Sequence, residues 1–173
     1  MPLDPPIDLH PDEVRQVLEP LRNDFSIALV APGNAFAVGA IIRVAHSFLA
    51  REIFVVGGGE WYPKASMGME KYETIRIVRD FEELAAAVAG RPIWVAEKDF
   101  ARVSVQQVKD FPPGVVFVFG SERFGVPADV VARADEVVGI PLYGINHSLP
   151  LTVAAGIVMH EWARRRYAEG ALL

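Results

Sequence analysis

Three polar side chains in separate parts of the chain are of the types that bind and orient a ligand. Arg43 lies on a predicted helix whose two preceding isoleucines face the core, so its guanidinium points elsewhere. A guanidinium keeps its proton and binds phosphate or carboxylate bidentately. Glu122 follows Gly120, a glycine that lets the backbone approach a ligand closely after an apolar run. Together with Ser148 in a later loop, these residues suggest binding and positioning.

Other kinds of chemistry lack the residues they need. The sequence has no cysteine, which excludes disulfides, thiolate metal sites and cysteine nucleophiles. His46 and His147 have no second ligand at metal spacing, so we expect ordinary polar roles and no metal. Ser148 lacks the histidine and aspartate setting of a nucleophile. The glycines at 57–59 do not form the G-x-G-x-x-G turn of a dinucleotide-binding domain.

These residues are positioned by short apolar runs that alternate with helical stretches. This pattern predicts an α/β fold, a parallel sheet flanked by helices on both faces. The final helix ends in Arg164, Arg165 and Arg166, which we expect to be solvated. The predicted strands are 26–30, 52–56, 74–78, 93–96, 114–119 and 136–140, and the predicted helices are 11–22 (kinked or ended early by Pro20), 38–49, 81–89, 127–134 and 151–167, with a helical turn within 103–108.

The chain has the length of one domain. We expect residues 1–24 to form an N-terminal extension with a short helix, and residues 25–173 to form the domain itself. Ligands of open parallel sheets bind at the carboxyl ends of strands. Three loops are therefore candidates for the site: 96–98, 120–122 and 141–148.

Composition sets limits on location and partners. The N-terminus (1–6) has no basic stretch followed by an apolar one, and no apolar run is long enough to span a membrane, so we expect a cytoplasmic protein without a membrane partner. The formal net charge of −5 argues against a nucleic-acid binder. A local basic patch on an acidic protein can still bind phosphate.

Three segments together resemble the motifs of the SpoU/TrmH branch of the SPOUT methyltransferases. They are VGAIIRVAHSF at 38–48, FVFGSERFGVP at 117–127, and IPLYG at 140–144 followed by Ser148–Leu149 and VAAGI at 153–157. The resemblance covers about residues 25 to 165. It implies a C-terminal trefoil knot, a homodimer formed through the knot region, and S-adenosylmethionine as cofactor. The implied activity is methylation of a ribose 2′-hydroxyl of tRNA or rRNA.

The resemblance also assigns roles to individual residues. It places Arg43, Glu122 and Ser148 in the catalytic centre, with Glu122 orienting the site by accepting hydrogen bonds. The basic and aromatic residues near the site suit RNA binding, and the apolar ones suit a pocket for adenine. The expected RNA-binding residues are Lys64, Lys71, Tyr72 and Arg123. The expected cofactor-binding residues are Val95, Ala96, Glu97, Gly120, Ile140, Leu142, Ser148 and Leu149.

Two positions depart from the family pattern. Ala37 stands where the family usually has asparagine, and Asn34 is the nearest asparagine. Pro150 stands where the third motif usually has asparagine, directly after the Asn146–His147 pair and Ser148–Leu149. These departures leave two alternatives open. One is an inactive knotted module that binds cofactor or RNA, and the other is a methyltransferase with a base nitrogen or a small molecule as acceptor.

Overall fold

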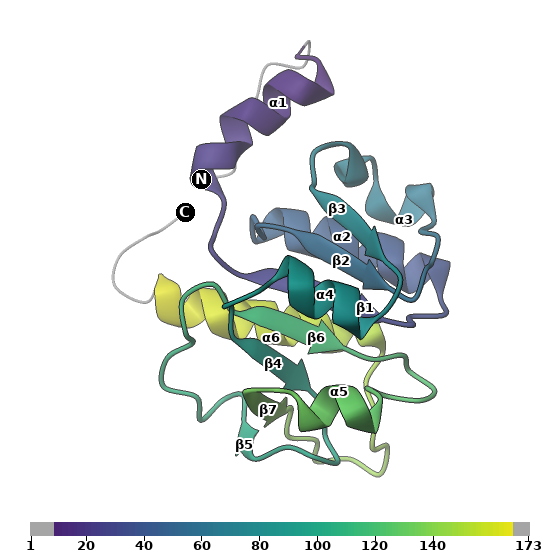
Figure 1. Ribbon diagram of the computed structural model, residues 1–173, viewed down its shortest axis with the longest axis vertical. Helices are drawn as coiled ribbons and strands as arrows, with labels where there is room; N and C mark the ends of the chain where they lie inside the picture. The colour runs from purple at the N-terminus through teal and green to yellow at the C-terminus, as the bar shows by residue number, and fades with distance from the viewer. Residues whose placement is uncertain (1–8, 168–173) are drawn as a thin grey trace.

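The computed structural model describes residues 9–167, and within them the chain forms a parallel sheet with helices on both faces (Figure 1). The sheet has the strand order β3-β2-β1-β6-β4-β7-β5. Every neighbouring pair of strands is parallel, as the sequence predicts. The strands are β1 (Ser26–Val30), β2 (Ile53–Val56), β3 (Ile75–Val78), β4 (Ile93–Ala96), β5 (Val103–Ser104), β6 (Val116–Phe119) and β7 (Glu136–Gly139).

Two hydrophobic clusters cover the two faces of the sheet. In β1, Ile27 and Leu29 point to one face, while Ala28 and Val30 point to the other. The first face is covered by α2 and α6, and the second by α4 and α5. The helices and 3₁₀ turns are α1 (Pro11–Leu18), η1 (Glu19–Leu21), α2 (Ala35–Ser47), α3 (Pro63–Ser66), η2 (Met69–Lys71), α4 (Phe81–Ala87), α5 (Ala128–Ala132) and α6 (Leu151–Arg166).

Two differences from the predicted elements have a clear physical reason. The prediction of a helical turn within 103–108 is wrong for its first two residues, because Val103 and Ser104 form β5 beside β7. This strand is too short to give a local pattern and exists only through its pairing. Helix α2 begins at Ala35 rather than at Val38. The earlier start is stabilised by Asn34, whose side chain accepts hydrogen bonds from the backbone N–H groups of the first turn.

The N-terminal helix α1 lies at one end of the molecule beside η2, where the Arg15 Nε donates to the carbonyl of Lys71 at 2.7 Å (Figure 1). Arg22 ties the segment after α1 to the core. Its guanidinium donates to the carbonyl of Ala50 at 2.8 Å, to the carbonyl of Tyr72 at 2.6 Å and to the carboxylate of Glu73 at 2.7 Å. The expected division at residue 24 stays a prediction. Residues 1–8 of the expected extension and residues 168–173 of the expected domain lie outside the described part of the chain.

Helix α6 returns across the sheet to pack against α2. The trefoil knot at this end of the chain stays a prediction. The prediction that the arginines at the end of α6 are solvated is wrong for Arg165. This side chain is largely buried and donates to the carbonyls of Val105, Gln106 and Val108.

Among the residues that the structure describes, no helix is long and apolar enough to cross a membrane.

Candidate active site

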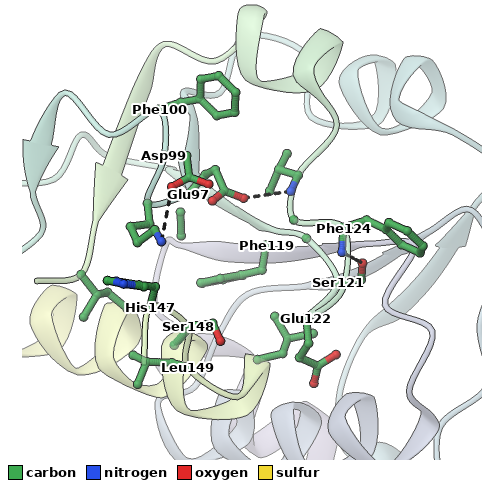
Figure 2. A pocket seen from close by; sticks show the side chains of 18 of the residues that line it. Glu97, Asp99, Phe100, Phe119, Ser121, Glu122, Phe124, His147, Ser148 and Leu149 are labelled. Carbon is green, nitrogen blue, oxygen red and sulfur yellow. Dashed lines mark hydrogen bonds and ion pairs between the residues drawn. The ribbon is translucent and has the colours of Figure 1, made fainter. Parts of the chain in front are cut away.

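A cavity of about 360 Å³ lies where the carboxyl ends of β4, β6 and β7 meet (Figure 2). Three loops enclose it, and each follows one of these strands. They are the three loops that the sequence predicts as the site. The volume lies within the range of cofactor and small-molecule sites.

The loop after β6 folds back on itself so tightly that only glycine fits at Gly120. A Cβ atom at this position would lie 2.0 Å from the carbonyl carbon of Gly125 and 2.3 Å from the backbone nitrogen of Val126. The backbone N–H of Gly125 donates to the carbonyl of Ser121 at 2.9 Å, and the backbone N–H of Phe124 donates to the Ser121 Oγ at 3.1 Å. The backbone itself therefore forms one wall of the cavity.

Glu97 holds this loop from the other side. Its carboxylate accepts a hydrogen bond from the backbone N–H of Val126 at 3.0 Å. Gly125 has a φ of +65°, and a Cβ there would lie 2.5 Å from the Glu97 Oε2. Glu97, an expected cofactor-binding residue, lines the cavity, but one of its oxygens is engaged by the protein. No local pattern in the sequence predicts this contact, because it joins residues far apart in the chain.

The apolar wall comes from the loop after β7 and the start of α6. Of the expected cofactor-binding residues, Ile140, Leu142 and Leu149 line the cavity, and so does Ala96 at the end of β4. Val95 does not line it. Its side chain is fully buried in the cluster that packs against α4 and α5.

Ser148 and Glu122 face the cavity from different loops (Figure 2). Asn146 shapes the loop around Ser148, because its Oδ1 accepts from the Ser148 backbone N–H at 3.3 Å and from its hydroxyl at 3.4 Å. Arg123 lines the cavity too, and its guanidinium lies 5.1 Å from the centre of the Phe124 ring. These contacts leave both Glu122 and Ser148 exposed to a ligand.

Arg43 does not line this cavity but a second hollow, formed by α2, α3 and α6. Lys64 lines the same hollow. The first turn of α6 separates the two sites, since Leu151 faces the cavity and Thr152 faces the hollow. Arg43 and Lys64 are thus brought together, away from the cavity of their own chain.

Lys71 and Tyr72 lie elsewhere, at the amino end of β3 and near α1. The carbonyl of Lys71 accepts from the Arg15 Nε at 2.7 Å, and the Tyr72 ring lies 6.0 Å from the His46 ring. Neither residue lines the cavity or the hollow. Lys64, earlier in the same stretch of chain, lines the hollow instead.

Several lining residues were not predicted as site residues. Phe119 ends β6 at the cavity, and His147 stands beside Ser148 (Figure 2). Most come from the loops or strand ends already singled out, so a wider reading of those loops would have found them. The unpredicted lining residues with large or charged side chains are Lys98, Asp99, Phe100, Phe119, Phe124, His147 and Leu151. In the part of the chain that the structure describes, no cluster of histidine or acidic residues could hold a metal ion.

The two departures from the family pattern have structural explanations. Ala37 is buried, and its backbone N–H donates to the Asn34 Oδ1 at 3.2 Å. Asn34 is therefore engaged in capping α2 and does not replace an asparagine at position 37. Pro150 directly precedes α6, at the N-cap, where its lack of an N–H leaves no helical hydrogen bond unmade.

Comparison with known proteins gives a consistent result. Residues 24–160 match the model of the SpoU rRNA Methylase family. A tRNA (cytidine(34)-2′-O)-methyltransferase of Burkholderia ambifaria is 31% identical over 159 residues, which cover 85% of this chain and 99% of the relative.

Two solved structures share the fold at appreciable sequence identity. The TrmH/SpoU tRNA modifying enzyme of A. aeolicus superposes with a TM-score of 0.79 at 27% identity, covering 92% of this chain and 84% of that one. An AdoMet-bound rRNA methyltransferase from Sinorhizobium meliloti superposes with a TM-score of 0.71 at 25% identity, covering 87% of this chain and 59% of that one. By its motifs, its fold and this match over most of its length, the chain belongs to the SpoU family of RNA methylases.

Proposed function

We propose that the cavity at the ends of β4, β6 and β7 binds S-adenosylmethionine, and that the chain methylates a ribose 2′-hydroxyl of tRNA or rRNA. Membership of the SpoU family makes it an RNA 2′-O-methyltransferase that uses this cofactor. The placement of the cofactor in this cavity rests on the loop at Gly120. This loop is packed so closely that only glycine fits, and its backbone forms a wall of the cavity. The solved relative from Sinorhizobium meliloti is described as AdoMet-bound.

The residues present fit this cofactor. Ile140, Leu142 and Leu149 offer an apolar surface to a flat base, and the adjoining backbone can read the polar edge of that base. Ser148 and Glu122 lie at the same cavity with polar atoms for the ribose and methionine parts. When bound, S-adenosylmethionine supplies a methyl group on a positively charged sulfur, which is a good electrophile.

Positioning of the RNA then supplies much of the remaining catalysis. We assign Arg43 to bidentate binding of a phosphate next to the target ribose, because a guanidinium keeps its proton and is a poor base. Glu122 accepts hydrogen bonds that orient the site. Lys64 lies with Arg43 and adds a second positive charge for the phosphate backbone.

A homodimer is part of this proposal. Arg43 and the cavity lie on either side of the first turn of α6 within one chain, so a second copy can place its own Arg43 at the cavity. Exposed apolar side chains near these sites, such as Val153 on α6 and Phe124 after β6, favour association. A cytoplasmic location stays a prediction.

The test has two steps. Calorimetric titration with S-adenosylmethionine and S-adenosylhomocysteine is expected to give saturable binding. Methyl transfer to unmodified tRNA and rRNA transcripts, followed by nuclease digestion, is expected to release 2′-O-methylnucleosides, and Arg43→Ala serves as control. Release of a base-methylated nucleoside would show that the acceptor is a base nitrogen and not a ribose hydroxyl. Cofactor binding without transfer to any transcript would favour the inactive module, in which Ala37 and Pro150 depart from the family pattern.

A further inference from the structure

Two aromatic rings are stacked on the surface beside the hollow that holds Arg43. Phe36 and Tyr62 have ring centres 6.3 Å apart and ring planes 29° apart. Phe36 is 62% exposed and Tyr62 is 43% exposed. An apolar ring left this open at the start of a helix gains little from burial in the fold. Its placement is therefore better explained by a ligand.

The two rings are held in place by the backbone. Asn34 caps α2, with its Oδ1 accepting from the Phe36 N–H at 3.1 Å. The N–H of Tyr62 donates to the carbonyl of Ala35 at 2.8 Å. Gly39 lets the two segments approach, because a Cβ there would lie 2.5 Å from the carbonyl oxygen of Tyr62. The aromatic pair is thus preorganised, which lowers the entropic cost of binding a ligand.

Positive charge lies on the same helix face as the exposed ring. Phe36, Ala40, Arg43 and Ser47 follow helical spacing, and all four line the hollow. Lys64 joins them from α3. Among the described residues, neither Arg43 nor Lys64 has a carboxylate within 4.0 Å, although most charges of this acidic protein are negative. Unpaired cations beside an aromatic ring match the chemistry of a single-stranded nucleotide.

We propose that the Phe36–Tyr62 pair stacks an unpaired nucleobase of the substrate RNA, next to the phosphate held by Arg43 and Lys64. Phe36 and Arg43 are seven residues apart on α2, about 10 Å along the helix axis, which separates a base subsite from a phosphate subsite. The inference rests on the proposed function and adds the substrate class: an unstacked nucleotide in a loop or single strand. A base inside a duplex cannot reach the rings.

The experiment uses a short fluorescein-labelled oligoadenylate and an abasic strand of the same length. Anisotropy titrations compare the full-length protein with Phe36→Ala, Phe36→Trp and Lys64→Ala. Ile77→Ala, which removes an exposed apolar side chain from β3, is the matched control. Titration with S-adenosylhomocysteine shows for each variant that the cofactor site is intact.

We expect Phe36→Ala to weaken binding of oligoadenylate by about 10-fold and to leave abasic binding unchanged. Phe36→Trp should retain the affinity, because indole stacks as well. Lys64→Ala should weaken binding of both strands and lower the salt slope by about one, whereas Phe36→Ala should not change the slope. Ile77→Ala should behave as the wild-type protein.

Three results overturn this proposal alone. One is equal loss of oligoadenylate and abasic binding in Phe36→Ala. Another is unchanged affinity in that variant while the wild-type protein binds the cofactor and methylates RNA, which leaves the proposed function intact. The third is a shift of Phe36→Ala from dimer to monomer in sedimentation, which would mean that the rings pack against a second copy of the chain. A wild-type protein that binds neither strand nor any transcript contradicts the proposed function as well.

Discussion

The carboxylate of Glu97, after β4, accepts a hydrogen bond from the backbone N–H of Val126, at the far end of the loop after β6. The peptide that carries this N–H is the same one that presses on Gly120 from the other side. Glu97 and Gly120 therefore clamp the Gly125–Val126 peptide between them. The shape of the cavity wall depends on both residues.

Replacing Glu97 tests the clamp. We expect Glu97→Ala to weaken binding of S-adenosylhomocysteine by about 10-fold, because a backbone hydrogen bond to a charged group contributes about 1.5–3 kcal/mol. Glu97→Gln keeps an oxygen that accepts from Val126, so calorimetry should show most of the affinity restored. Equal loss in both variants would mean that the charge of Glu97 meets the ligand directly.

Gly120 should tolerate no side chain. Gly120→Val forces its Cβ into the Gly125 backbone, so we expect loss of measurable cofactor binding and a lower melting temperature. Gly144 lies in the neighbouring loop, and a Cβ there meets nothing within 4 Å. Gly144→Ala is the matched control and should bind the cofactor as the wild-type protein does. Normal binding by Gly120→Val would place the cofactor elsewhere.

Arg43 should affect transfer and not cofactor affinity. We expect Arg43→Ala to lower kcat/KM for RNA by at least about 100-fold, since misplacement of the reacting groups has effects of this size. Arg43→Lys keeps the charge but loses bidentate geometry, so it should recover little. Calorimetry with S-adenosylhomocysteine should not distinguish the variants, because we assign Arg43 to the RNA phosphate and not to the cofactor. Full activity in Arg43→Lys would show that the positive charge at this position is sufficient without bidentate geometry.

The buried pair of Arg22 and Glu73 should contribute strongly to stability. The Glu73 side chain is 0% exposed and that of Arg22 is 4% exposed. Glu73 also lies 2.8 Å from the His46 Nδ1. We expect Glu73→Ala to lower the free energy of unfolding by about 3–5 kcal/mol, because it removes one partner of a buried ion pair and leaves the Arg22 charge buried.

Urea unfolding measures this, and the double variant Arg22→Met/Glu73→Leu provides the control. Removing both charges avoids the unpaired ion, so the double variant should be more stable than Glu73→Ala. A double variant that is no more stable than Glu73→Ala would show that the two charges are not coupled.

Stability at low pH should depend on Glu161. Burial alone raises the pKa of Glu161, but hydrogen bonds from Arg164 and Arg165 outweigh it and hold the pKa below the ordinary 4.5. A depressed pKa gives stability that is present above the unfolded-state pKa and is lost as pH falls through the folded-state pKa.

Thermal melts at about pH 6 and about pH 3.5 span this change. We expect Glu161→Gln to be less stable than the wild-type protein at the higher pH and to lose less stability on acidification. Glu60→Gln removes an exposed carboxylate that has no ion-pair partner among the described residues, and it should follow the wild-type protein. Identical pH dependence in all three proteins would show that the Arg164 and Arg165 contacts do not stabilise the fold.

Most of the fold follows from local patterns along the chain. Apolar runs such as Ser26–Val30 alternate with amphipathic helices, and this alternation predicts a parallel sheet covered on both faces. Because the carboxyl ends of parallel strands share one edge, the sequence also predicts that the loops at Glu97, Gly120 and Ser148 converge. Strand β5 could not be predicted, since Val103 and Ser104 become a strand only through pairing with β7.

The sequence by itself determined the family, the alternation of strands and helices along the chain, and the three loops of the cavity, because these depend on residue types at short spacing. Only the tertiary structure decided which charged residues meet. Lys64 joins Arg43 because α3 packs on α2 at Gly39, whereas Lys71 and Tyr72 turn towards α1. Contacts of this kind join residues distant in sequence, and they are set by the packing of whole elements against each other.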